Sequence, residues 1–157
     1  MFSMTTSRDV LAEITRHRMA SFAVESQRYV NESKDDGGIK FIRPLFYKPF
    51  DVSYNYSAHD HEYEASRLWE ESMELAEYFY NAMIAIGMKN QDARKVLPNS
   101  TACTIMMDVN LRELLHIYNL RSSPAAYPEI RELMRLLKIE VDKVLPGFLP
   151  EKEETKE

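Results

Sequence analysis

Three arginines and one histidine lie close together near the start of the sequence, in the stretch TRHRMASFAVESQRY. They are Arg16, His17, Arg18 and Arg28, with small polar residues between them. The whole chain has a formal net charge of -5, so this positive charge is a local concentration. A guanidinium group presents a planar fork of N–H donors that matches phosphate, carboxylate or pyrimidine oxygens. The pattern therefore predicts a pocket for a small anionic ligand.

Further arginines stand at the ends of expected structural elements. Arg94 lies beside the helix-ending stretch Val-Leu-Pro, Arg121 closes a later helix, and the Arg16–Arg18 triplet closes an earlier one. Guanidinium groups at element ends can converge on one ligand. An isolated arginine usually lies on the surface with its stem over apolar neighbours, and spacing alone leaves both interpretations open.

A polar face is expected on the helix that Asn110 is predicted to cap. Arg112, His116 and Asn119 follow one another at steps of four and three residues. Residues at these steps lie on the same side of a helix. The three side chains can therefore face one site together.

The stretch HDHEYE, from His59 to Glu64, raises the alternative of a metal site. In a helix, His59 and His61 would point in different directions, unlike the i, i+4 histidine pair of a helical zinc site. A polar helix start explains the stretch better, and we expect no metal.

A covalent nucleophile is a second alternative. Ser21, Ser26 and Cys103 are the candidates, but spacing places no histidine–carboxylate pair beside any of them. Cys103 stands in the apolar run ACTIMM, which is typical of a small core residue. A covalent mechanism therefore has little support.

The composition is that of an ordinary globular chain. Its 157 residues, 45% hydrophobic and 29% charged, suffice for one domain with a core. A sequence pI near 5.5 argues against broad binding to nucleic acid or anionic membranes. The single cysteine excludes a disulfide within the chain. We expect no signal peptide and no membrane span, and hence a cytoplasmic location.

Helical periodicity dominates the pattern of expected elements. The first expected helix begins at a Thr6/Asp9 capping pair and runs into Arg16–Arg18, and an extended segment follows at Lys40–Phe50. A long helix is expected at Asp60–Ile86, with Leu68 and Phe79 on its apolar stripe, and then a short helix that Asn90 caps and that runs to Leu97. A buried strand at Asn99–Val109, a helix from Asn110 to Arg121, and a last helix that begins at Pro128 and has a stripe ending at Val144 complete the pattern. The prediction is one helix-rich α+β domain over residues 1–157, with 146–157 as a frayed tail.

Two separate stretches resemble the flavin-dependent thymidylate synthase (ThyX) family. The first, RHRMASFAVESQRY, has the Arg-His-Arg triplet followed by a serine- and arginine-bearing loop. The second runs from Ala93 to Leu133 and has the Ala-Arg-x-x-Leu-Pro element, the Asn-x-Arg helix start and the Leu-Arg ending in order. The resemblance extends from about Ser7 to Val144. It implies a small, mostly antiparallel sheet beside the helices.

The resemblance also implies an activity, the reductive methylation of dUMP to dTMP. FAD would be the cofactor, with methylenetetrahydrofolate and NADPH as co-substrates. No cysteine attacks the base in this family, which agrees with the interpretation of Cys103 as a core residue. The implied assembly is a homotetramer with active sites between subunits, and no nucleic acid or membrane partner is implied.

Site residues follow from the positions of the matching motifs. The resemblance implies flavin contacts from Arg16, His17, Arg18, Asn110, Arg112 and His116. It implies dUMP contacts from Glu13, Arg16, Ser26, Gln27, Arg28, Arg94 and Arg121, with Ser26 and Arg28 supplied by a neighbouring subunit. Arg121 would lie against the pyrimidine and stabilise charge that develops on the ring, so it is the expected catalytic residue.

The sequence departs from the family pattern at several places. Many relatives have Gln at the position of Glu13 and Asn-Glu at Ala23-Val24. After Arg121 they commonly have His or Arg where this chain has Ala125, and Gln-Trp where it has Tyr127-Pro128. Glu13 near a nucleotide oxygen would repel it unless paired, for example by Arg16. Relatives also have several tens of residues, including sheet strands, before the Arg-His-Arg helix. The alternatives are therefore a shortened relative that binds nucleotide or flavin without turnover, and one part of a split enzyme.

Overall fold

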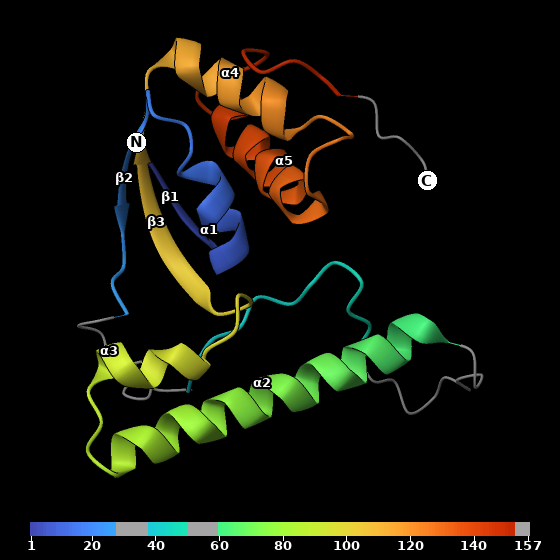
Figure 1. The fold of residues 1–157 in the computed structure, drawn as a ribbon. Coiled ribbons are helices and arrows are strands. Elements are labelled where there is room, and N and C mark those ends of the chain that lie inside the picture. Colours follow the sequence, from blue (N-terminus) through green and yellow to red (C-terminus); the bar gives the residue numbers. More distant parts are fainter. Residues whose placement is uncertain (28–37, 50–59, 153–157) are drawn as a thin grey trace. The chain divides into compact units, whose positions relative to one another are not determined.

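The computed structural model describes residues 1–27, 38–49 and 60–152, which Figure 1 colours along the chain. By their contacts the residues divide into two compact units. The first unit combines Met1–Val24 with Thr104–Glu157, and the second is Glu25–Cys103. Helices and one small antiparallel sheet make up the described structure, so the predicted α+β class is confirmed.

The sheet has the strand order β1-β3-β2, formed by β1 (Phe2–Ser7), β3 (Ala102–Asp108) and β2 (Ser21–Val24). β2 runs antiparallel to β3, with Ser21 opposite Asp108 and Val24 opposite Ile105. Side chains along β3 alternate, since Ile105 and Met107 are buried whereas Met106 is 41% exposed. The strand predicted here is confirmed, but it is half-buried and not buried on both faces.

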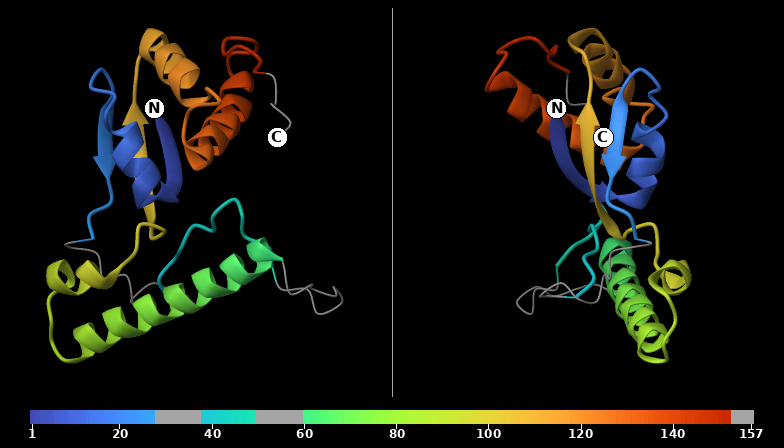
Figure 2. Two further views of the ribbon diagram at one scale, coloured as in Figure 1. Left: turned by 45° about the vertical axis from the view of Figure 1, so that its right-hand side comes forward. Right: turned by 90° about the vertical axis from the view of Figure 1, so that its left-hand side faces the viewer.

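Three helices belong to the first unit: α1 (Arg8–Ile14), α4 (Leu111–Arg121) and α5 (Pro128–Asp142). Figures 1 and 2 show them on one face of the sheet. α5 is in contact with both α1 and α4. Their apolar sides close the core, in which Ile14, Ile117 and Met134 are completely buried.

The start of α1 differs from the predicted capping pair of Thr6 and Asp9. β1 continues through Thr6, and Ser7 occupies the N-cap position. The Asp9 carboxylate accepts hydrogen bonds from the Ser7 hydroxyl and from the backbone N–H of Val10. The helix also ends at Ile14, so Arg16–Arg18 lie in the turn that follows it and not within it.

The ends of α4 and α5 follow the predicted signals. The Asn110 side chain accepts the backbone N–H of Glu113 at 3.0 Å, and Pro128 lies in the first turn of α5. The predicted stripe of α5 is buried through Val141, but Val144 is 78% exposed. That residue lies beyond the end of the helix, where the periodicity no longer applies.

The segment after α5 was predicted to be a frayed tail, but part of it is packed. Leu149 is only 1% exposed, and the Tyr118 hydroxyl donates to the backbone oxygen of Pro150 at 3.2 Å. Leu149 is therefore buried and Pro150 is bonded to α4, whereas Glu151 and Lys152 are exposed.

The second unit contains α2 (His61–Ala85), α3 (Asn90–Ala93) and the 3₁₀ turn η2 (Arg94–Val96). Asp60 caps α2 by accepting the N–H of Tyr63 at 3.1 Å, and Gly87 follows its end with a left-handed φ of 93°. The long helix is thus confirmed. Lys89, and not Asn90, occupies the N-cap position of α3.

The buried side of α2 differs from the predicted one. Met73 and Tyr80 face the core of this unit, where Tyr80 packs with Ile39 and Ala93. Leu68 and Phe79 of the predicted stripe are 53% and 52% exposed. The extended segment predicted near Lys40 contributes one isolated antiparallel bridge, between Phe41 and Thr101. Among the described residues, no helix has the length and apolarity that a bilayer span requires.

Candidate functional site

Arg121, the last residue of α4, is held on three sides within the first unit. Its Nε donates to Nε2 of His17 at 3.0 Å. Its Nη1 donates to the carboxylate Oε2 of Glu13 at 2.6 Å, and its Nη2 to the backbone oxygen of Glu13 at 2.9 Å. The side chain is 16% exposed. Every nitrogen of the guanidinium group therefore has a partner in the last turn of α1 or in the turn that follows it.

The local fold explains why this end of α1 accepts a cation. The last carbonyl groups of a helix lack partners within the helix and carry partial negative charge. α1 buries Leu11 and Ile14, which leaves Glu13 on its half-buried side. The turn after α1 is closed by a bond from Ala20 N to the His17 oxygen at 3.1 Å. Arg121 thus satisfies both the helix end and the Glu13 carboxylate.

His17 lies in that turn and is 7% exposed. Burial is the main reason that its pKa is lowered, and the charge of Arg121 lowers the pKa further. Its ring is therefore neutral at pH 7, with one nitrogen as acceptor and the other as donor. Because Nε2 accepts from Arg121, the proton is assigned to Nδ1.

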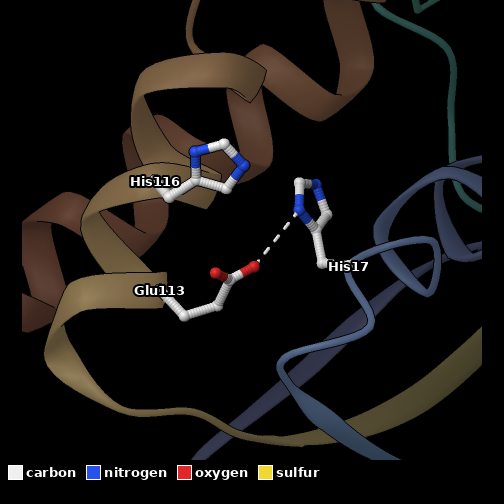
Figure 3. A group of neighbouring side chains, drawn as sticks. All are labelled: His17, Glu113 and His116. Carbon is white, nitrogen blue, oxygen red and sulfur yellow. Dashed lines mark ion pairs between the residues drawn. The ribbon is translucent and has the colours of Figure 1, made fainter.

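Nδ1 of His17 faces Glu113, in the first turn of α4, at 3.7 Å from Oε1 (Figure 3). His116 lies one turn further along α4, and its ring makes an edge-to-face contact with His17 at 6.0 Å between centroids. Among the described residues these three form one group whose nitrogen and oxygen atoms lie within 4.8 Å of one another, a spacing that suits a metal ion. To bind a metal through Nδ1, His17 would first have to lose the proton that its bond with Arg121 places there.

Residues 1–147 match the family described as "Thymidylate synthase complementing protein". The chain belongs to this family. The resemblance drawn from the two sequence motifs is thereby confirmed.

Relatives named flavin-dependent thymidylate synthase match the same region. The protein of Haloarcula marismortui is 35% identical over 137 residues, which cover 81% of this chain and 56% of the relative. That of Halobacterium salinarum is 34% identical over 141 residues, covering 83% and 57%. That of Geobacter sulfurreducens is 33% identical over 136 residues, covering 84% and 53%. The chain spans about half the length of the curated relatives it matches.

The flavin residues expected from the thymidylate synthase complementing family are mostly exposed on the first unit. Arg16 and Arg18 flank the buried His17, and Arg112 and His116 lie on one side of α4. Asn110 is exposed too, although its oxygen already caps α4. These positions provide cationic and amide donors at the surface of the first unit.

The remaining nucleotide residues expected from the family lie in the second unit. Ser26 and Arg94 are half-buried, and Gln27 is buried with no partner for its Nε2 among the described residues. Arg28 lies outside the described residues, as does His59 of the metal alternative. Convergence of Arg94 with Arg121 therefore remains a prediction.

The partners of Arg121 were not predicted from the sequence. Arg16 was the partner suggested for Glu13, but Arg16 is exposed and Arg121 makes the ion pair. Glu13 and Arg121 are 108 positions apart. The family resemblance placed both residues near dUMP, but nothing in the sequence paired them with each other.

Proposed function

We propose that this protein is a flavin-dependent thymidylate synthase that converts dUMP to dTMP, with methylenetetrahydrofolate as carbon donor and NADPH as reductant. The observation that supports the proposal is that three hydrogen bonds to Glu13 and His17 fix Arg121, in a chain that belongs to this family. A guanidinium group has five N–H donors. Glu13 and His17 occupy three of them, so two remain to bind a ligand.

Arg121 would serve the chemistry through its fixed charge. A guanidinium group in a protein does not act as a base. Its two remaining N–H groups can donate to pyrimidine oxygens and stabilise negative charge that develops on the ring. Because Glu13 and His17 already orient the group, little reorganisation is needed when the nucleotide binds.

The residues of the first unit also suit FAD. A dinucleotide with a pyrophosphate needs cationic donors at an accessible surface, and the exposed Arg16, Arg18 and Arg112 are of that kind. The Asn110 amide and His116 add hydrogen-bonding groups. When bound, the reduced flavin would supply the hydride. We assign dUMP phosphate binding to Ser26, Gln27, Arg28 and Arg94.

We further propose a homotetramer in which neighbouring subunits complete each site. Within the second unit, Leu68, Leu75 and Phe79 of α2 and Ile86, its C-cap residue, are between 52% and 79% exposed. Apolar side chains gathered on one helix suit a contact between subunits. This exposed side of α2 supports the assembly.

The direct test is turnover by the purified full chain. Flavin absorbance, together with dTMP formed from dUMP, methylenetetrahydrofolate and NADPH, is the expected result. R121A should lower the rate by about 100- to 1000-fold, the usual scale for removing a donor to a developing anion, while flavin remains bound. R121K keeps the charge but loses the planar fork, and it should also lose most activity.

A second candidate function is binding without turnover, or action as one part of a split enzyme. It is favoured by the chain's span of about half its relatives' length. Bound flavin that none of the substrates alters, with no dTMP formed, would reject the synthase and support this candidate. A colourless protein that binds neither FAD nor dUMP would reject both.

A further inference from the structure

We propose that His17 is a positioning residue for Arg121, holding the guanidinium group through Nε2 while Glu13 holds its other edge. The proposal rests on the proposed function only for the identity of the ligand. The three hydrogen bonds that hold Arg121, called the hold below, are present in the chain without any ligand.

The geometry requires a partner on the Nε side. The two bonds from Glu13 engage Nη1 and Nη2, at 2.6 and 2.9 Å. A guanidinium group anchored only there can still tilt about its outer edge. The bond from Nε to His17, at 3.0 Å, fixes the opposite edge of the plane. Together the three bonds determine where the two unused N–H groups point.

The hold requires one tautomer of His17. Nε2 can accept from Arg121 only if the proton of the neutral ring is on Nδ1. The Glu113 carboxylate faces Nδ1 at 3.7 Å and attracts that proton, and the ring is 7% exposed. The titratable groups that face His17 are Glu113, His116 and Arg121, all from α4. In the opposite tautomer, the Nε2–H of His17 would face the Nε–H of Arg121, and neither group could accept the bond.

Protonation of His17 would break the hold for the same reason. A ring with protons on both nitrogens presents an N–H to the N–H of Arg121, and two positive charges then lie side by side. Burial and Arg121 both lower the pKa of His17, so the neutral ring persists to a lower pH than in an exposed histidine. Glu113 acts in the opposite direction by favouring the charged ring.

This role differs from a direct flavin contact, which the family resemblance implies for His17. Both ring nitrogens face groups of the protein, and the side chain is buried. It also differs from metal ligation with His116 and Glu113, which needs a lone pair on Nδ1. Burial and the partners of the ring nitrogens thus separate this role from a flavin contact, and the tautomer separates it from metal ligation.

Two matched substitutions test the proposal. H17Q places an amide oxygen near the position of Nε2 and can still accept from Arg121. H17N places its amide near Nδ1 and cannot reach Arg121. H61Q, which changes an exposed histidine at the start of α2, is the control. All three are made in the full chain.

The first measurement is the arginine Nε–H signal of Arg121 in ¹H–¹⁵N NMR spectra without ligand, assigned by its loss in R121K. We expect a slowly exchanging signal in the unsubstituted protein, H17Q and H61Q, and rapid exchange in H17N. Protection here means that this N–H exchanges more slowly with water than the Nε–H of an exposed arginine at the same pH. In the unsubstituted protein, acidification should abolish this protection as His17 gains its second proton. The acid titration decides the question even if H17N does not fold.

The second measurement is dUMP affinity by calorimetry. H17N should bind about tenfold more weakly than the unsubstituted protein, the scale of one hydrogen bond to a charged group. H17Q should lose less affinity, and flavin stoichiometry should be equal in both variants.

Equal loss of flavin in H17Q and H17N, with an unchanged Arg121 signal, would show a flavin contact and overturn the proposal. Protection that persists in H17N, or through the titration of His17, would overturn it as well. If the unsubstituted protein binds no dUMP, the proposed function fails while the NMR comparison still decides the role of His17.

Discussion

Glu13 contacts Arg121 twice, through its carboxylate Oε2 and through its backbone oxygen. The ion pair joins the C-terminal ends of α1 and α4, and the Glu13 side chain is 37% exposed. An anionic ligand that approaches Arg121 therefore meets a guanidinium group whose charge is already partly balanced.

Replacing Glu13 by Gln should strengthen binding of an anionic nucleotide. The amide oxygen can still accept from Nη1, so the orientation of Arg121 is kept while the repelling charge is removed. We expect dUMP affinity to rise roughly twofold to fivefold, the scale of a partly exposed charge interaction. Calorimetry at low salt measures the gain, which should shrink as salt is added. E13A, which also loses the acceptor, is the comparison, and equal affinities for E13Q and E13A would contradict this account.

Replacing Glu129 by Gln should stabilise the protein at neutral pH. Glu129 lies in the first turn of α5, near Asp9 of α1. Burial is the main cause that raises the pKa of Glu129, and the negative charge of Asp9 is the second. A carboxyl group with a raised pKa in the fold costs stability when it is ionised, and the cost disappears as the pH falls below its unfolded value. E129Q should gain roughly 0.5 kcal/mol, the scale of a solvent-screened charge interaction. Urea unfolding at pH 7 and at pH 4 measures the effect, and a gain that is larger at pH 4 would refute the mechanism.

Replacing Leu149 by Ala should destabilise the chain. Leu149 is 1% exposed, and truncating a buried leucine removes its transfer free energy and leaves a cavity. The expected loss is about 2–4 kcal/mol in the free energy of unfolding. V144A changes an apolar residue that is 78% exposed and should have almost no effect. Equal unfolding midpoints for the two variants would mean that the segment after α5 does not pack.

Placing a charge on the exposed side of α2 should reduce self-association. Phe79 is 52% exposed, and in an assembled contact a buried glutamate would lack a partner. F79E should shift the oligomer toward monomer in light scattering coupled to size-exclusion chromatography. E71Q, at an exposed charged position of the same helix, is the control. A tetramer retained by F79E would exclude this side of α2 as the contact.

Local signals predicted much of the fold. The caps at Asp60 and Asn110 and the proline at Pro128 mark real helix starts, because a cap depends on residues within one turn. The side of α2 that is buried was not predictable in the same way. That helix has apolar residues on more than one side, and the choice between Leu68 and Met73 depends on what packs against it.

The bonds that fix Arg121 were not predicted from the sequence. Arg121, His17 and Glu13 were all selected, yet their mutual bonds join positions more than 100 residues apart in sequence. No local pattern encodes such a pairing. It depends on the packing of α1 and α4 and on the tautomer of a buried ring, which is set by a neighbour and not by sequence spacing.

The pairing of Arg121 also bears on how quickly a phosphorylated ligand can arrive. A guanidinium group compensated by a nearby carboxylate projects little field into the solvent, whereas the exposed Arg16, Arg18 and Arg112 can attract anions over a longer range. Diffusional capture and transition-state stabilisation would then rest on different arginines. Raising the ionic strength should therefore slow the binding of the phosphorylated ligand far more than it slows the chemical step.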